Sequence, residues 1–329
     1  APKLTQGDLV KEFERRWSEW LGTKHSVLCN SGSSANLLML YAYYLFKGAA
    51  KELNIIVPVV SWSTTISPLI QLEGLVPILC DASADTLSID TNHFEKLCIR
   101  YKPDALLLVP ILGIMPNMDE IVRICDKYNV DLLTDSCETV GSKYKDKKSG
   151  NFGLMTTFSG YFGHVFSLVE AGIISTDNKE LYEILLSIKS HGWVREWDKD
   201  SRDKILNDFF IDDFKSQYTF FNPGFNVRST EINAFLGLKQ LEKLDFFCEK
   251  RKNILQLYDK LIVNNYWKLK ISNEDIGFAY PVISPKKKDV VRNLISSGVE
   301  TRPIVAGSFE YQPVWKMFGN DLVERDELF

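Results

Sequence analysis

Short runs of β-branched and other apolar residues alternate along this chain with longer segments of helical periodicity. Parallel strands that are buried on both faces read as continuous apolar runs, and helical crossovers must connect them. The alternation therefore predicts an α/β protein with a mainly parallel sheet, in which ligands bind at the carboxyl ends of the strands. Residues 118–128 and 179–190 are the predicted crossover helices. The predicted strands are 55–58, 76–79, 106–109, 130–134 and 172–175.

A change of rhythm late in the chain suggests the domain organisation. Residues 230–258 have the pattern of one long amphipathic helix, and a smaller α+β unit is expected to start near Trp267. A chain of 329 residues is long enough for about two domains. We predict a large domain over residues 1–240 and a small C-terminal domain over residues 241–329.

The composition excludes several classes of function. With 45% apolar and 25% charged residues, the chain is too apolar to be disordered. A net charge of -4 gives no electrostatic basis for binding nucleic acid or an anionic membrane. The longest apolar runs are too short to span a bilayer. The six cysteines, none at CxxC spacing, predict buried thiols in a reducing compartment rather than a metal site, so we expect a cytoplasmic protein.

Small polar residues stand where a helical segment begins, in Asn30-Ser31-Gly32-Ser33-Ser34-Ala35-Asn36. The free N–H groups at a helix N-terminus attract anions, so a phosphate is one candidate ligand. A simple N-cap by Ser33 or Ser34 explains these residues equally well. The usual nucleotide signatures, GxGxxG after a strand and GxxxxGK[ST], do not occur in the sequence.

Two carboxylates follow the strand predicted at 130–134. Asp135 closes this strand, and Glu138 comes three residues later. A buried carboxylate needs a cationic partner, and the protonated ring nitrogen of a bound cofactor would be one. A structural salt bridge explains Asp135 equally well.

Trp62 and His164 are further candidates that follow strand-like runs. A flat cofactor would stack on the indole of Trp62, although a tryptophan in such a place usually belongs to the core. His164 is one of only four histidines and stands in a loop after residues 156–159. Lone histidines are more often structural than catalytic, so neither residue decides the function by itself.

Taken in order, these pieces resemble the DegT/DnrJ/EryC1/StrS type of sugar aminotransferase, a family of pyridoxal-phosphate enzymes with the aspartate aminotransferase fold. The resemblance runs essentially from end to end. It implies the type I fold of pyridoxal-phosphate-dependent transferases, with a mainly parallel seven-stranded sheet in the large domain and a smaller C-terminal α+β domain. The residues that carry it are Asn30-Ser31-Gly32-Ser33-Ser34-Ala35, Val57-Pro58, Ser61-Trp62-Ser63-Thr64, Asp135-Ser136-Cys137-Glu138, Phe158-Ser159, Glu170-Ala171-Gly172, His191-Gly192 and Gly224-Phe225-Asn226-Val227-Arg228.

One position departs from the aminotransferase pattern and changes the expected reaction. The lysine that binds the cofactor covalently in that family stands six residues before a Glu-Gly-Gly motif, and here this position is His164. An imidazole cannot form that bond, but it can move protons near neutral pH. His164 resembles the dehydratase branch of the family, the GDP-sugar 3-dehydratases of colitose synthesis and their CDP-sugar relatives. His191-Gly192-Trp193 and the segments 135–138 and 301–305 are most similar to the GDP-sugar enzymes.

The resemblance implies noncovalently bound pyridoxal phosphate and pyridoxamine phosphate, with His164 as the catalytic residue. L-glutamate would supply the amino group. The substrate would be a nucleotide-linked 4-keto-6-deoxyhexose, first of all GDP-4-keto-6-deoxy-D-mannose, in dideoxysugar synthesis for O-antigen or lipopolysaccharide. The products would be a 3-deoxy-4-keto sugar and ammonia. The iron–sulfur cluster that a second form of the branch uses is not expected, because residues 193–218 contain no cysteine.

The cofactor-binding residues are transferred from the family position by position. Gly32, Ser33 and Ser159 would bind the cofactor phosphate. Asn226 would reach it from a neighbouring subunit, which implies a homodimer with shared active sites.

Other residues are assigned by the same resemblance to the cofactor ring and to the substrates. Asp135 would keep the ring nitrogen protonated, Trp62 would cover one face of the ring, and Glu138 would hydrogen-bond near its phenolic oxygen. Surface ion pairing explains Arg195 as well as a role in binding does. The candidates for the diphosphate or for the glutamate carboxylate are Arg195, Arg228 and Arg302.

Three departures from the family pattern affect the site. Ala171 replaces the first glycine of Glu-Gly-Gly, and its methyl group is expected to shift that turn slightly. Val165 stands where the dehydratases carry a second histidine, so the preference for nucleotide or substrate could differ. The chain stops at Phe329, before the usual end of the family, which suggests a trimmed polypeptide that lacks part of the small domain.

Two other functions stay open at the level of sequence. A nucleotide-sugar aminotransferase would leave nitrogen on the sugar and release no ammonia. A non-catalytic homologue would bind the cofactor or a nucleotide sugar as a regulator, which only the altered turn at Ala171 favours. The chain keeps four of the expected site residues together, which argues against a non-catalytic homologue. They are Asp135, Glu138, Ser159 and His164.

Overall fold

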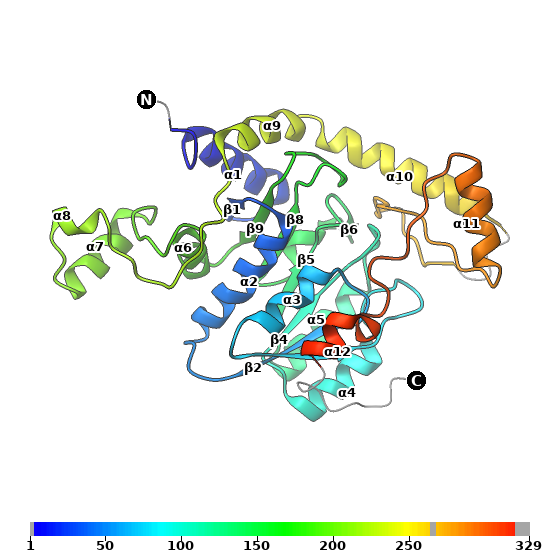
Figure 1. Ribbon diagram of the computed structural model, residues 1–329, viewed down its shortest axis with the longest axis horizontal. Coiled ribbons are helices and arrows are strands. Elements are labelled where there is room, and N and C mark those ends of the chain that lie inside the picture. Colours follow the sequence, from blue (N-terminus) through cyan, green and yellow to red (C-terminus); the bar gives the residue numbers. More distant parts are fainter. Residues whose placement is uncertain (1–2, 264–267, 320–329) are drawn as a thin grey trace. The chain divides into compact units, whose positions relative to one another are not determined.

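The computed structural model describes residues 3–263 and 268–319, and it divides into two compact units (Figure 1). Unit 1 comprises the described residues up to Lys51 and residues 154–243, and unit 2 comprises residues 52–153 and those from Leu244 onward. The predicted domain boundary near residue 240 stays a prediction. Trp267, the expected start of the small unit, lies outside the described residues.

Unit 1 is built from helices around antiparallel strands. Its elements are α1 (Asp8–Leu21), β1 (His25–Cys29), α2 (Gly32–Phe46), β8 (Met155–Ser159), β9 (Gly172–Thr176), α6 (Lys179–Ile188), α7 (Lys199–Asp208), α8 (Asp213–Ser216) and α9 (Glu231–Leu241). The strand order is β1-β9-β8, and both pairings are antiparallel. Gly172 lies opposite Cys29 on one side and Ser159 on the other. These three residues therefore form a row at one end of the strands.

Helix α1 shows why this part of the sequence folds as it does. Its apolar residues recur every three or four positions, which places them on one face of the helix. Val10, Phe13, Trp17 and Leu21 are all buried. The helix ends at Gly22, whose φ of 92° is the left-handed conformation that suits glycine, and α1 packs beside α9 (Figure 1).

Unit 2 contains the parallel strands. Its elements are β2 (Leu53–Pro58), α3 (Ser63–Gln71), β3 (Leu75–Cys80), α4 (Thr91–Tyr101), β4 (Ala105–Leu108), α5 (Met118–Tyr128), β5 (Asp131–Asp135), β6 (Lys143–Tyr144), β7 (Lys147–Lys148), a short 3-10 helix (Ser149–Asn151), α10 (Leu244–Leu261), α11 (Lys287–Ser296), a second 3-10 helix (Phe309–Tyr311) and α12 (Pro313–Phe318). The strand order is β5-β4-β2-β3, with every pair parallel.

The parallel arrangement brings three loops to the same edge of unit 2. Ile55 pairs with Ala105, and Ala105 pairs with Asp131, so β2, β4 and β5 run in register. The residues that follow these strands, 59–62, 109–112 and 136–138, therefore share the carboxyl edge. Strand β4 is buried along its whole length, as expected for a central parallel strand.

The predicted fold class is confirmed, with two local differences. Seven main strands alternate with helices, and the predicted helix 118–128 is α5. The long helix predicted over 230–258 is instead two helices, α9 and α10, because the chain makes a tighter turn in which the Lys243 N–H donates to the Gln240 carbonyl. Residues 268–319 contain no strand among the residues described, and Ser308 makes only an isolated bridge to Val60.

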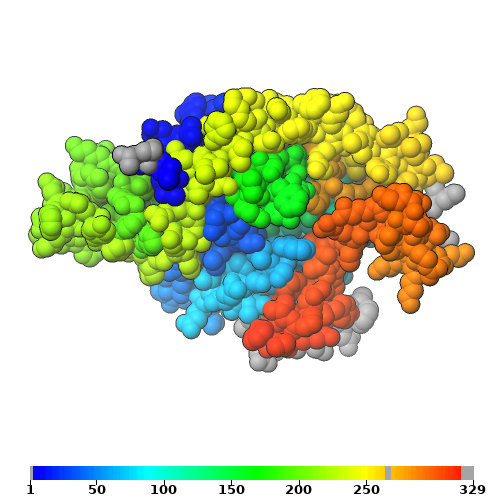
Figure 2. All heavy atoms as spheres, turned by 45° about the horizontal axis from the view of Figure 1, so that its top comes forward, coloured from blue at the N-terminus to red at the C-terminus, as the bar shows by residue number. Residues whose placement is uncertain are grey.

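The segment around α7 and α8 exposes an unusual number of aromatic side chains. Phe210 is 94% exposed, Phe214 84% and Tyr218 72%. In Figure 2 this segment, in yellow-green, lies on the surface of unit 1. Apolar rings on a surface are typical of a contact with a partner. No helix within residues 3–263 and 268–319 is both long and apolar enough to cross a membrane.

Candidate active site

The N-terminus of α2 forms an open turn directly after β1. Its N-cap is Ser31, whose hydroxyl accepts a hydrogen bond from the Ser34 N–H at 3.1 Å. The predicted cap at Ser33 or Ser34 is therefore wrong by two or three residues, because Ser31 has the extended backbone that a cap requires. The Gly32 N–H has no hydrogen-bond partner within the part of the chain that the structure describes. This turn therefore presents a donor to an anion.

Gly172 packs the start of β9 against this open turn. A Cβ at this position would lie 2.0 Å from the Ser31 carbonyl oxygen, so only glycine fits. The preceding residue, Ala171, is fully buried, and its methyl group faces Gly160, which has no side chain. The positive φ of this loop falls on Val169 (68°) and not on Ala171, so the alanine is accommodated without backbone strain.

His164 lies in the loop between β8 and β9. The loop is closed by the Gly160 N–H, which donates to the Ala171 carbonyl at 2.8 Å. The His164 N–H donates to the Tyr161 carbonyl at 3.0 Å, and the two rings meet edge to face with centroids 5.9 Å apart. The imidazole is partly exposed, whereas the following Val165 is buried. A partly exposed imidazole on a closed loop is suited to proton transfer.

Residues 224–228 cross the end of β1 and carry two further predicted residues. The Asn30 N–H donates to the Val227 carbonyl at 2.9 Å, which ties this segment to the open turn. Asn226 forms a β-bridge with Ser190, and its side-chain oxygen accepts from Arg228 Nε at 3.0 Å. The structure therefore brings Asn226 and Arg228 together beside the turn that contains Gly32.

Trp193 brings together two of the three predicted arginines. The Arg195 guanidinium lies 3.5 Å from the centroid of the indole, and that of Arg228 lies 5.8 Å from it. Cation–π contacts of this kind hold a guanidinium in place while its N–H donors stay available. Arg195 also pairs with Glu196 at 3.5 Å. Sequence reasoning noted Trp193 only as part of a motif and missed this role.

Arg302 lies elsewhere, in unit 2. Its side chain is 81% exposed and pairs with Glu300. Arg195 and Arg228 both belong to unit 1.

The ring-side candidates lie at the carboxyl edge of unit 2. Asp135 ends β5 and is buried. Its Oδ2 accepts from the Thr65 hydroxyl at 2.6 Å, and its Oδ1 accepts from the Cys137 N–H at 3.2 Å. Thr65 belongs to the first turn of α3, whose N-cap is Trp62. The indole of Trp62 is 58% exposed, so this tryptophan is not a core residue.

Glu138 has a perturbed carboxyl group at the same edge. Burial raises its pKa to about 7, and the negative charge of Asp135 acts in the same direction. The Leu112 N–H, which donates to Glu138 Oε2 at 2.7 Å, opposes this shift because it stabilises the ionised form. The two carboxylates at this edge therefore differ in environment, and that of Glu138 favours the protonated form more than an ordinary glutamate does. Neither Leu112 nor Thr65 was predicted, although Thr65 comes directly after the Ser61-Trp62-Ser63-Thr64 motif.

Each unit, taken by itself, carries polar groups whose chemistry suits one part of a phosphorylated pyridine cofactor. In unit 1, the Gly32 N–H stands at a helix N-terminus. The buried Ser159 hydroxyl accepts from the Tyr161 N–H at 3.2 Å and can donate its own proton. In unit 2, the Asp135 carboxylate is buried and accepts hydrogen bonds from Thr65 and Cys137.

Comparisons with known proteins agree with this chemistry. The sequence profile of the DegT/DnrJ/EryC1/StrS aminotransferase family matches residues 1–325. The chain is 38% identical over 315 residues to the GDP-4-keto-6-deoxy-D-mannose 3-dehydratase of Escherichia coli O55:H7, covering 93% of this chain and 80% of that protein.

Two solved structures of a GDP-4-keto-6-deoxymannose-3-dehydratase are similar as well. One is a mutant with bound GDP-perosamine, with a TM-score of 0.87 and 36% identity over 96% of this chain and 83% of that one. The other contains a trapped PLP-glutamate geminal diamine, with a TM-score of 0.86, 36% identity and the same coverage.

Proposed function

The chain belongs to the DegT/DnrJ/EryC1/StrS aminotransferase family, and we propose that it is a pyridoxal-phosphate-dependent 3-dehydratase of a nucleotide-linked 4-keto-6-deoxyhexose. The proposed substrate is GDP-4-keto-6-deoxy-D-mannose, and the proposed amino donor is L-glutamate. The observation that carries the proposal is His164, which stands where the aminotransferases of this family have their lysine. The similarity to a 3-dehydratase over 93% of the chain supports the same reaction.

We propose that the phosphate of the cofactor binds to Gly32, Ser33 and Ser159, because a helix N-terminus and hydroxyl groups suit an anion. When bound, the cofactor supplies a pyridinium ring that accepts electrons from the reacting carbon. Asp135, oriented by Thr65 and Cys137, keeps the proton on the ring nitrogen.

Trp62 and Glu138 complete the ring-side contacts in this proposal. The exposed indole of Trp62 offers a flat apolar face to the ring. Glu138, whose pKa burial raises to about 7, is the proposed hydrogen-bond partner near the phenolic oxygen.

His164 is the proposed catalytic acid and base. Its imidazole takes up a proton from the carbon next to the cofactor nitrogen and passes a proton to the C3 hydroxyl group as that group leaves the sugar. Arg195 and Arg228, which both lie near the indole of Trp193, are the proposed ligands of the diphosphate. Arg302 remains a candidate for the glutamate carboxylate.

We further propose a cytoplasmic homodimer in which Asn226 serves the neighbouring active site. The exposed rings of Phe210, Phe214 and Tyr218 support a contact between subunits, since such a surface is costly to leave in water. Light scattering after gel filtration tests this assembly. A mass of one chain would contradict it.

The function is tested by product analysis. The protein is incubated with pyridoxal phosphate, L-glutamate and the GDP-linked or CDP-linked 4-keto sugar, and sugar mass and ammonia are measured. Loss of one sugar oxygen with release of ammonia is expected. An added amino group would make the protein an aminotransferase, and no reaction with either sugar would favour another substrate or a binding protein.

Two substitutions separate the role of His164 from cofactor binding. His164→Asn should retain the cofactor but lower turnover by about 10²- to 10⁴-fold, the usual contribution of a general acid and base. His164→Lys should bind pyridoxal phosphate covalently, so that borohydride reduction adds its mass to the protein. An active asparagine variant would remove His164 from the mechanism, and failure to trap the lysine adduct would refute its placement at the cofactor.

A further inference from the structure

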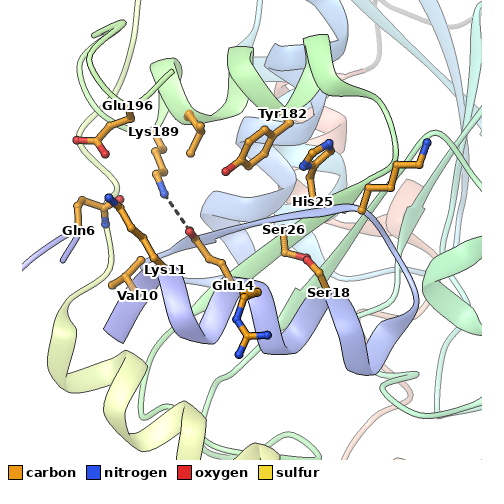
Figure 3. Close-up of a pocket in the computed structure, with 13 residues that line it drawn as sticks. Gln6, Val10, Lys11, Glu14, Ser18, His25, Ser26, Tyr182, Lys189 and Glu196 are labelled. Carbon is orange, nitrogen blue, oxygen red and sulfur yellow. Dashed lines mark hydrogen bonds and ion pairs between the residues drawn. The ribbon is translucent and has the colours of Figure 1, made fainter. Parts of the chain in front are cut away.

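A groove of about 340 Å³ opens in unit 1 between α1, β1 and the end of α6 (Figure 3). Its floor contains a buried ion pair that the proposed mechanism does not use. Lys189 Nζ lies 3.1 Å from Glu14 Oε1, and Figure 3 shows the lysine reaching from the end of α6 to the glutamate on α1. The lysine side chain is only 1% exposed and that of the glutamate 11%.

The ion pair satisfies both backbone polar groups of one residue at the end of β1. The Leu28 N–H donates to Glu14 Oε1 at 2.7 Å, and the Leu28 carbonyl accepts from Lys189 Nζ at 3.5 Å. Because β1 stands at the edge of the strand order, none of the other strands that the structure describes pairs with these groups. The two charged side chains therefore replace a neighbouring strand at this point.

The backbone of Lys189 holds the segment that carries Asn226 and Arg228. The Lys189 carbonyl accepts from the Val227 N–H at 3.1 Å, and the Val227 carbonyl accepts from the Asn30 N–H at 2.9 Å. Asn30 comes two residues after Leu28. The contacts thus form a closed circuit from Glu14 through the end of β1 and residues 224–228 to Lys189 and back to Glu14.

Global stability does not explain such a pair, because moving two charges out of water costs about as much as their attraction returns. Apolar residues of similar volume are often equally stable. A buried ion pair can instead favour one arrangement of the groups around it, because any other arrangement would leave a buried charge without its partner. Here the pair joins Leu28 at the end of β1 to Lys189, whose backbone carbonyl accepts from the Val227 N–H.

We propose that Glu14 and Lys189 are positioning residues, which lock Asn226 and Arg228 in place beside the turn at Gly32. This inference rests on the proposed function, since Asn226 and Arg228 are its cofactor and substrate residues. The cofactor phosphate of the neighbouring active site, which Asn226 serves in the proposed dimer, then meets this side chain already in position, so that no ordering of residues 224–228 is needed on binding.

The test uses the double variant Glu14→Gln with Lys189→Met in the full chain, because it removes both charges and leaves neither buried alone. Amide hydrogen exchange is followed by mass spectrometry in peptides that span residues 27–33 and 222–229. The control is Arg15→Met with Glu19→Gln, which removes an exposed ion pair on the same helix. Binding of pyridoxamine phosphate is measured by equilibrium dialysis.

Exchange in both peptides should become at least about tenfold faster in the double variant, with unchanged exchange in α5 and a similar melting temperature. Pyridoxamine phosphate should bind about tenfold more weakly. The control variant should match the wild type in all three measurements.

Unchanged exchange in these two peptides would overturn the inference, as would faster exchange throughout the chain, since the pair would then support only the fold as a whole. If the wild type does not bind pyridoxamine phosphate, the proposed function fails. The exchange measurement still decides whether Glu14 and Lys189 hold residues 224–228.

Discussion

Replacing Glu138 with glutamine should stabilise the folded protein, and the gain in unfolding free energy over the wild type should be larger at high pH than at low pH. The folded-state pKa of Glu138 is about 7, against 4.5 for an ordinary glutamate. The folded protein therefore binds more protons than the unfolded chain between these two values, and its stability falls as the pH rises through this window. Since one pKa unit corresponds to about 1.4 kcal/mol, ionised Glu138 costs the fold about 3 kcal/mol at pH 8.5.

Glutamine keeps the acceptor for the Leu112 N–H but never ionises, so Glu138→Gln removes this cost. Urea unfolding of the protein without cofactor is measured at pH 4.5 and pH 8.5, on either side of the sequence pI of 5.7. The gain in unfolding free energy over wild type should be larger by about 3 kcal/mol at the higher pH. Glu73→Gln, which removes an exposed carboxyl group of the same unit, is the control. A gain that is equal at both pH values would refute the reasoning, because Glu138 would then be fully solvated.

Three further substitutions test the site. Gly172→Ala should destabilise the protein by more than about 3 kcal/mol in thermal unfolding, because its Cβ would lie 2.0 Å from the Ser31 oxygen. The control Gly48→Ala meets nothing within 4 Å and should cost only the backbone strain at its φ of 90°, about 1–2 kcal/mol, so equal losses would contradict the close contact. Asp135→Asn should abolish both the reaction with glutamate and that with the sugar, and measurable turnover in either would show that the ring nitrogen needs no carboxylate. Thr65→Val leaves the Asp135 carboxylate without its hydroxyl donor, so it should weaken cofactor binding by about 1–3 kcal/mol in a titration, and unchanged affinity would argue against that role.

The order of elements was predictable from the sequence because it depends on local pattern. Apolar runs that are buried on both faces gave the strands of unit 2, and helical periodicity gave α5 with the correct ends. The same local pattern did not reveal the interruption between α9 and α10, since both helices continue one apolar rhythm across the turn at Glu242 and Lys243.

The candidate site residues were also predicted from the sequence alone, and their roles stay predictions. Asp135 and His164 were found from their residue types and their places after strands, together with the family resemblance. Residue type and order along the chain determine which reactions are available, because an imidazole cannot replace a lysine in covalent cofactor binding. This much needs no coordinates.

Only the tertiary structure decided how these groups are held. Thr65 reaches Asp135 across 70 positions of sequence, and Lys189 reaches Glu14 across 175. The pKa of Glu138 depends on burial and on the Leu112 N–H, neither of which any local pattern encodes. Hydrogen bonds and burial depend on which residues are close in space, whereas periodicity reports only on residues that are close in sequence. The contacts that support the site could therefore be found only in the folded structure.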